Sequence, residues 1–188
     1  MGQRQSSLKP TQLNDLRHQT HFSDSELIEF HKEFIKSNPT GRITKEEMIK
    51  QYRNLFPDGD PRAFTDQLFR IYDANEDGLI DFREFICGIG LLTHGSPEQK
   101  LRAAFRMCDL DNNGCISKWE LESVIAAIYT TIAPLRNNVS DSKAAAAVAS
   151  NIFDSLDKNH DDKITFEEFV AGTKASSDIL HLLETMSA

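Results

Sequence analysis

Twelve consecutive residues, 73–84, combine oxygen-bearing side chains with a glycine in a spacing that suits a metal ion. Side chains supply oxygen at positions 1, 3, 5, 9 and 12, and position 7 supplies a backbone carbonyl; in chain order these are Asp73, Asn75, Asp77, Leu79, Asp81 and Glu84. A hard cation such as Ca²⁺ takes about six to eight oxygen ligands, which alternate residues of a tight loop can provide. Gly78 at position 6 permits the positive-φ bend that wraps a loop around an ion. The stretch therefore predicts a calcium-binding loop between two helices.

Three further twelve-residue stretches repeat this pattern, and we number the four stretches in chain order as loop 1 (36–47), loop 2 (73–84), loop 3 (109–120) and loop 4 (157–168). All four have Ile at position 8 and Glu at position 12. The predicted ligands of loop 3 are Asp109, Asp111, Asn113, Cys115, Ser117 and Glu120. Those of loop 4 are Asp157, Asn159, Asp161, Lys163 and Glu168. Cys115 and Lys163 would contribute only their carbonyl oxygens. A repeat at this spacing argues against chance acidic turns and predicts four helix–loop–helix motifs.

Loops 1 and 4 depart from the pattern. Lys36 at position 1 of loop 1 would repel a cation, and Pro39 stiffens position 4. We therefore expect loop 1 to keep its shape without binding metal, which leaves two or three sites for Ca²⁺. Loop 4 has Asp162 where the others have glycine, and an Asp in the left-handed conformation costs about 1 kcal/mol. Loop 4 is predicted to bind more weakly than loops 2 and 3. His160 is interpreted as facing solvent rather than as a zinc ligand.

Helix signals around the loops predict an all-α fold. In the three intact loops, positions 9 and 12 form capping pairs for the helix that follows, namely Asp81/Glu84, Ser117/Glu120 and Thr165/Glu168. Ser23 with Glu26, and Asp60 with Pro61, mark the starts of two earlier helices. One motif alone cannot bury its apolar face, so loops 1 and 2 are predicted to pair, as are loops 3 and 4.

The predicted units follow from this pairing. They are an N-terminal segment with a short helix (1–22), an N-terminal lobe (23–92), a hinge (93–97), a C-terminal lobe (98–176) and a C-terminal helix (177–188). The polar stretch 133–141 is predicted to be a connector inside the C-terminal lobe.

Composition restricts the class of protein. The 188 residues carry a net charge of −8, which argues against non-specific nucleic-acid binding because that requires a basic surface. An odd number of cysteines, three, favours a reducing cytosol. The first six residues, MGQRQS, fit the pattern for N-myristoylation at Gly2 once Met1 is removed. We therefore expect a cytoplasmic protein without a membrane span or secretion signal, in reversible contact with membranes through its lipid.

Over essentially its whole length the chain resembles the neuronal calcium sensor family, the group of recoverin, visinin-like and hippocalcin-like EF-hand proteins. The resemblance rests on the Met-Gly start and on the segments NPTG (38–41), FPDGD (56–60), DFREF (81–85), EQKL (98–101) and DLD (109–111). It implies four EF-hand motifs in two paired lobes, with a short β-bridge at Ile of position 8 between paired loops. Three positions differ from the family's usual residues, since Asn38 replaces Cys, Phe30 replaces Trp, and Asp162 stands at position 6 of loop 4, where it weakens the expectation of a fully active site.

The same resemblance implies a function. Family members act as calcium–myristoyl switches, in which calcium loading opens the lobes, releases the acyl chain and uncovers an apolar groove. On this chain the groove would be lined by Phe22, Phe34, Tyr52, Phe56, Phe85 and Ile89. Implied partners are a membrane and an amphipathic helix of a signalling target such as a kinase, cyclase or channel.

Two other functions stay open at this stage. A cytosolic calcium buffer would need neither a lipid nor a partner groove. A constitutive regulatory subunit of a phosphatase, similar to calcineurin B, would bind its partner without calcium. An enzyme is not expected, because the acidic residues are accounted for as ligands and no nucleophile–base pair or nucleotide-binding loop is present. A single Trp, Trp119, also disfavours a calcium photoprotein.

Overall fold

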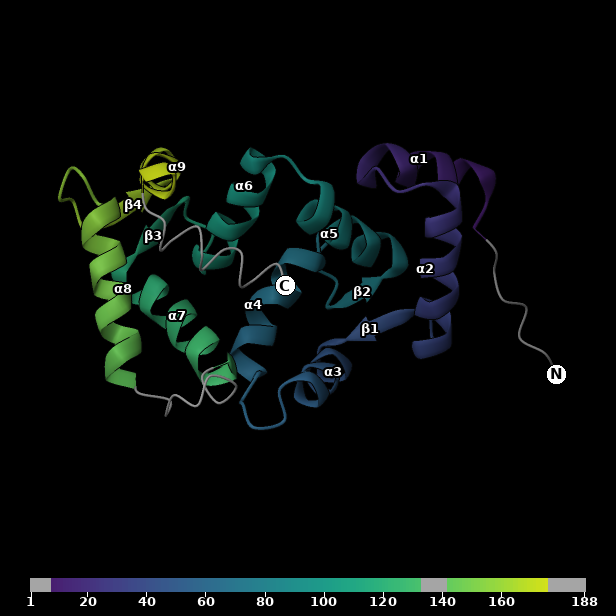
Figure 1. The fold of residues 1–188 in the computed structure, drawn as a ribbon, viewed down its shortest axis with the longest axis horizontal. Helices are drawn as coiled ribbons and strands as arrows, with labels where there is room; N and C mark the ends of the chain where they lie inside the picture. The colour runs from purple at the N-terminus through teal and green to yellow at the C-terminus, as the bar shows by residue number, and fades with distance from the viewer. Residues whose placement is uncertain (1–7, 133–141, 176–188) are drawn as a thin grey trace.

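The computed structural model describes residues 8–132 and 142–175, which form helices around two small antiparallel sheets (Figure 1). The predicted lipidation site Gly2, the connector 133–141 and the C-terminal helix 177–188 lie outside the described residues. Within the described residues, none of the helices has the length and apolar character needed to cross a membrane. The all-α fold with short β-bridges is confirmed.

The N-terminal half holds loops 1 and 2. Its elements are α1 (Pro10–Thr20), α2 (Asp24–Ser37), β1 (Arg42–Thr44), α3 (Lys45–Leu55), α4 (Arg62–Tyr72), β2 (Leu79–Asp81) and α5 (Phe82–His94). The C-terminal half holds loops 3 and 4. Its elements are α6 (Pro97–Cys108), β3 (Cys115–Ser117), α7 (Lys118–Ile132), α8 (Ser142–Leu156), β4 (Lys163–Thr165) and α9 (Phe166–Ala175). Each loop thus joins an entering helix to an exiting helix, as the repeat predicted.

Position 8 joins the loops in pairs. β1 pairs antiparallel with β2, so that Ile43 lies opposite Ile80, and β3 pairs with β4, so that Ile116 lies opposite Ile164. These four side chains are at most 4% exposed. The bridge therefore ties the two loops of a lobe together through backbone hydrogen bonds while both isoleucines complete the core beneath.

Each exiting helix begins at the predicted capping pair. The Glu84 amide donates to Asp81 Oδ1 at 2.9 Å, and the Asp81 amide donates back to Glu84 Oε2 at 3.1 Å. The corresponding reciprocal bonds are formed by Thr44/Glu47, Ser117/Glu120 and Thr165/Glu168. Two amides that a helix start would leave unpaired are satisfied in each case.

Two helix boundaries differ from simple sequence signals. α4 begins at Arg62, one residue later than the Asp60–Pro61 signal indicates, although Asp60 Oδ1 accepts the Arg62 amide and its carboxylate pairs with the Arg62 guanidinium. α5 continues through Thr93 and His94, so that only Gly95 and Ser96 separate it from α6. His94 Nδ1 lies 3.1 Å from the carbonyl oxygen of Thr20, which holds this end of α5 against α1.

α4 lies where the two halves meet. Figure 1 shows α1, α2 and α3 on one side of the molecule, α7, α8 and α9 on the other, and α4 between them in contact with α6 and α7. The Asp60 amide donates to the Thr130 carbonyl at 3.1 Å, and Thr131 Oγ1 donates to the Asp60 carbonyl at 3.2 Å. A Cβ on Gly59 would overlap the Thr131 carbonyl oxygen. Backbone therefore meets backbone at this contact, which only glycine permits.

Candidate metal centres

Loops 2, 3 and 4 share one backbone conformation. Position 4 has a positive φ in each, 59° at Glu76, 57° at Asn112 and 58° at His160. Position 6 has one as well, 79° at Gly78, 85° at Gly114 and 62° at Asp162. Asp162 therefore adopts the left-handed conformation that glycine supplies in the other two loops, at the cost expected for a residue with a Cβ. His160 is exposed, as predicted.

The carboxylate at position 1 organises each of these loops. Asp109 Oδ1 accepts the Asn113 amide and Oδ2 accepts the Gly114 amide, both at 3.0 Å. Asp73 and Asp157 accept the amides of the same two positions in their own loops, at 2.9–3.3 Å. All three aspartates are buried. Two backbone amides therefore hold the carboxylate of position 1 inside each loop.

The glutamate at position 12 reaches back across the loop. Glu120 Oε1 accepts the Leu110 amide at 2.8 Å, and Oε2 accepts the Ser117 amide at 2.7 Å. Glu84 and Glu168 likewise accept the backbone amides of positions 2 and 9 in loops 2 and 4. Hydrogen bonds from the backbone amide and the hydroxyl of Thr165 lower the pKa of the Glu168 carboxyl below its usual value. Because this glutamate begins the exiting helix, its position fixes the angle of that helix to the loop.

The donor set of loop 3 fits a hard cation. One carboxylate oxygen from each of Asp109, Asp111 and Glu120 lies within 4.8 Å of the other two, and Glu120 is 2% exposed. Three carboxylates this close repel one another, and a cation bound among them would offset that repulsion. Oxygen ligands at this spacing match Ca²⁺ rather than a metal that prefers nitrogen or sulfur. Cys115 contributes to β3 through its backbone, and its amide donates to Asn113 Oδ1.

Loop 1 has a different interior. α2 runs on through Ser37, which is position 2, whereas the helices entering the other loops end before position 1. The carboxamide of Asn38 at position 3 is buried and donates to the Phe34 carbonyl at 3.1 Å, so it caps α2. Lys36 pairs with Glu33 at 3.1 Å. Pro39 cannot adopt the positive φ that position 4 has in the other loops. The loop keeps its β-bridge while its side chains are used for other contacts.

Four of the six residues predicted to form an apolar groove make ring contacts in two separate pairs. The ring of Phe34 contacts that of Phe85 with centroids 5.1 Å apart, and Tyr52 stacks on Phe56 at 6.2 Å. Among the described residues, no ring contact joins the two pairs. Phe22 and Phe34 are buried, while Tyr52, Phe56, Phe85 and Ile89 are partly exposed. Whether they form a groove for a partner stays a prediction.

Sequence patterns alone did not identify several residues around the sites. Tyr72 stacks on Phe85 with centroids 6.4 Å apart, and burial raises the pKa of its hydroxyl. Arg70 reaches from α4 to loop 3, where it donates two hydrogen bonds. Neither Arg70 nor Tyr72 has a position in the repeat, which begins at Asp73 in this loop, and their partners lie on other elements.

Three loops of this conformation, each between two helices and paired through a β-bridge, define an EF-hand calcium-binding protein. The family description "EF-hand domain pair" matches residues 98–174, and "EF hand" matches residues 65–86. The chain is 38% identical to recoverin from Homo sapiens over 174 residues, 92% of this chain and 87% of that protein. It is also 38% identical to neuronal calcium sensor 1 from Lymnaea stagnalis over 183 residues, 97% of this chain and 96% of that protein.

A third relative is guanylyl cyclase-activating protein 1 from Lithobates pipiens, 34% identical over 164 residues, 86% of this chain and 76% of that protein. The chain belongs to the neuronal calcium sensor family. It is an EF-hand calcium sensor and not an enzyme.

Proposed function

We propose that this calcium sensor works as a calcium–myristoyl switch. Calcium binding at loops 2, 3 and 4 would change the angle of their exiting helices. The N-terminal lobe would then release an acyl chain on Gly2 and expose an apolar surface for a target. The protein would be cytoplasmic at low calcium and bound to membranes at high calcium. The observation that carries this proposal is the packing of α1 along α5, the exiting helix of loop 2.

The proposed ligands are those the repeat predicts. In loop 2 they are the side chains of Asp73, Asn75, Asp77, Asp81 and Glu84 with the carbonyl of Leu79. In loop 3 they are Asp109, Asp111, Asn113, Ser117 and Glu120 with the carbonyl of Cys115. In loop 4 they are Asp157, Asn159, Asp161 and Glu168 with the carbonyl of Lys163. Bound calcium would supply the positive charge that draws these oxygens together.

Contacts along α1 connect loop 2 to the N-terminal segment. Gln19 Oε1 accepts from Arg83 Nη2 at 3.3 Å and from Cys87 Sγ at 3.4 Å. Near the other end of α5, a Cβ on Gly90 would lie 2.8 Å from Cβ of Thr20, so the two helices touch closely. A rotation of α5 imposed by Glu84 would therefore have to move α1 or break these contacts.

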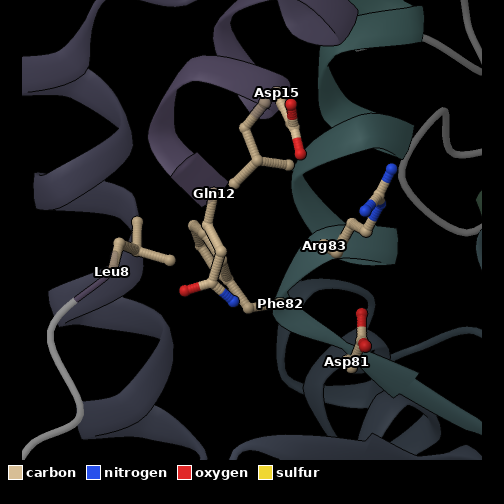
Figure 2. A pocket seen from close by; sticks show the side chains of 7 residues that line it. Leu8, Gln12, Asp15, Asp81, Phe82 and Arg83 are labelled. Atoms are coloured by element: carbon tan, nitrogen blue, oxygen red, sulfur yellow. The ribbon is translucent and has the colours of Figure 1, made fainter. Parts of the chain in front are cut away.

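The N-terminal segment approaches loop 2 directly. Figure 2 shows Leu8 and Gln12 of the N-terminal region facing Phe82 across a hollow of about 130 Å³, with Asp81 and Arg83 beside it. Leu8 is the first described residue and is packed against the core. Gly2 lies six residues before Leu8 in the sequence, and Leu8 lines the same hollow as the ligand residue Asp81. This placement supports a link between loop 2 and the lipid.

The energy scale suits a switch. One myristoyl chain binds membranes with an association constant of only about 10⁴ M⁻¹, so burial or exposure of the chain decides the location. A difference of a few kcal/mol in calcium affinity between two lobe conformations shifts their populations almost completely. The similar protein guanylyl cyclase-activating protein 1 acts, by its name, on a cyclase. We accordingly propose an amphipathic helix of a membrane-associated cyclase, kinase or channel as the partner.

Sedimentation of the acylated protein with liposomes tests the proposal. We expect the protein to pellet with calcium, to stay in solution with a chelator, and to lose pelleting in the Gly2→Ala variant. Pelleting that does not depend on calcium would make the lipid a permanent anchor. No pelleting under either condition would remove the membrane from the function.

A further measurement separates the alternatives. A cytosolic buffer would bind calcium without exposing apolar surface, so an environment-sensitive apolar dye would not change its fluorescence. A constitutive phosphatase-type subunit, similar to calcineurin B, would purify with its partner in the presence of chelator. The proposed switch predicts dye binding with calcium and partner capture only with calcium.

A further inference from the structure

Arg70 of α4, in the N-terminal half, makes a cross-lobe contact with a calcium loop of the C-terminal half. Its Nη2 donates to the backbone carbonyl of Asp109 and to Oδ1 of Asn112, both at 3.1 Å. Asp109 is position 1 of loop 3, whose carboxylate organises the loop. Asn112 is position 4, the residue with φ of 57°. One side chain of one lobe therefore holds two key positions of a loop in the other.

Loop 3 is special in this respect. Among the residues that the structure describes, positions 1 and 4 of loop 2 (Asp73 and Glu76) accept no hydrogen bond from the opposite half. The same holds for Asp157 and His160 of loop 4. A contact required for every EF-hand loop would recur in all three loops. The Arg70 contact is therefore specific to loop 3.

Packing does not enforce this contact. A hollow of about 390 Å³ lies between the halves at this point, bordered by Arg70, by Glu76 of loop 2 and by Asn112 of loop 3. Because the space is not filled by close-packed side chains, hydrogen bonds fix loop 3 relative to α4 here. Arg106 of α6 borders the same hollow, is exposed, and has no hydrogen bond or ion pair to another described residue.

The opposite end of α4 is also fixed to the C-terminal half. Asp60 exchanges hydrogen bonds with Thr130 and Thr131 at the end of α7, next to the close contact at Gly59. α4 is the entering helix of loop 2. The helix that leads into one calcium loop is therefore bound at its far end to α7 and at its near end to a second calcium loop.

We propose that Arg70 is a positioning residue for the calcium site of loop 3, supplied by the opposite lobe, and that it couples calcium binding at loops 2 and 3. The inference rests on the proposed calcium binding at loop 3. Arg70 stabilises the left-handed Asn112 and holds Asp109 in place, so less ordering remains to be done when an ion binds. Any coupling between two binding sites is reciprocal, so loop 2 would strengthen loop 3 as much as the reverse.

The charge of Arg70 acts in the opposite direction from its hydrogen bonds. A guanidinium beside a cation site repels the ion, so loss of charge alone would strengthen calcium binding. Loss of the hydrogen bonds would weaken it. Arg70→Met removes both effects, and Arg106→Met removes a charge at the same hollow without removing a hydrogen bond. The two variants therefore form a matched pair whose effects on affinity have opposite expected signs.

The first experiment uses metal-free protein and measures amide hydrogen exchange by NMR. In Arg70→Met we expect the amides of Asn113 and Gly114, which bind Asp109, to exchange about tenfold faster. The amides of Asp161 and Asp162 in loop 4 should be unchanged, and Arg106→Met should leave both loops unchanged. Unaltered exchange at loop 3, or equal acceleration in loops 3 and 4, would overturn the positioning role. This result does not depend on calcium.

The second experiment measures calcium affinity by titration calorimetry in Glu84→Gln/Glu168→Gln, in which loop 3 is the only intact loop. We expect Arg70→Met to weaken binding about threefold to tenfold and Arg106→Met to strengthen it slightly. With loop 2 restored, Arg70→Met should also abolish cooperativity between loops 2 and 3. Equal shifts in the same direction would show that Arg70 acts only as a charge. No calcium binding in the parent would overturn the proposed function and this affinity role together, while leaving the exchange result to stand.

Discussion

The backbone amide of Asp162 donates to Asp157 Oδ2 at 3.1 Å, which is the bond that Gly78 makes to Asp73 at 2.9 Å. The two loops thus reach the same shape with different residues at position 6. Asp162 has a φ of 62°, a conformation that glycine adopts without strain and that other residues adopt at a cost.

Asp162→Gly should therefore strengthen calcium binding at loop 4. A metal-free loop can relax a strained residue, whereas a loop closed around an ion cannot, so the strain is expected to oppose binding. Relief of about 1 kcal/mol corresponds to roughly fivefold tighter binding. Titration calorimetry in a Glu84→Gln/Glu120→Gln background isolates loop 4. Unchanged or weaker binding would contradict the strain argument and would point instead to the lost negative charge.

Creating a calcium site in loop 1 should require a substitution at position 4 as well as at position 1. Lys36→Asp restores a carboxylate at position 1, but Pro39 still blocks the positive φ at position 4, so we expect no additional bound ion. Lys36→Asp/Pro39→Asn removes both obstacles and should add one weak site, because Asn tolerates the left-handed conformation. The stoichiometry of calcium binding distinguishes the two variants. A gain of one ion by Lys36→Asp alone would show that charge, and not backbone shape, keeps the loop from binding.

Loop 1 should support loop 2 even though we expect it to bind no metal. Ile43 is 4% exposed and pairs with Ile80 across the bridge, so Ile43→Ala should destabilise the N-terminal lobe by about 2–4 kcal/mol. Part of this loss should appear as weaker calcium binding at loop 2. Ile116→Ala in the other lobe is the matched variant, and it should affect loops 3 and 4 instead. Thermal unfolding measures the stability of each variant, and calorimetry measures its calcium affinity. An Ile43→Ala protein with normal calcium affinity at loop 2 would show that loop 1 does not support loop 2.

The three cysteines should differ in reactivity. Burial, with smaller contributions from Glu120 and Asp109, raises the pKa of the Cys108 thiol to about 12. At pH 8 only about one Cys108 in ten thousand would be the reactive thiolate. A thiol reagent should therefore modify the half-exposed Cys115 first and Cys108 only as the protein unfolds. Cys108→Ala should leave the number of fast-reacting thiols unchanged; loss of a fast-reacting thiol would mean that Cys108 is accessible in the folded state.

Much of the fold follows from local sequence rules. The Ile at position 8 pairs across each lobe, and the residues at positions 9 and 12 cap each exiting helix as predicted. Lys36 and Pro39 were enough to mark loop 1 as different from the other three loops. The capping pairs depend on residues within one loop, so the repeat contains that information, whereas the bridge at position 8 is implied by the family resemblance.

The remaining features depend on contacts that lie outside the repeat, some close in the chain and some between distant elements. The carboxamide of Asn38 turns away from loop 1 because the Phe34 carbonyl at the end of α2 is its available acceptor. α5 extends to His94 because that ring meets the end of α1 at Thr20. Arg70 occupies no position of the repeat, and its partners become visible only when α4 is packed against loop 3.

The C-terminal half contacts both ends of α4, so the two halves are joined by more than the peptide link between α5 and α6. Only Gly95 and Ser96 form that link, while Asp60 and Arg70 form contacts that do not require it. Cleavage there would give two fragments that each retain a complete loop pair and the residues that form these contacts, so we expect the fragments to reassociate. The two fragments could then serve as a complementation reporter, whose signal is their reassembly when they are supplied as separate chains.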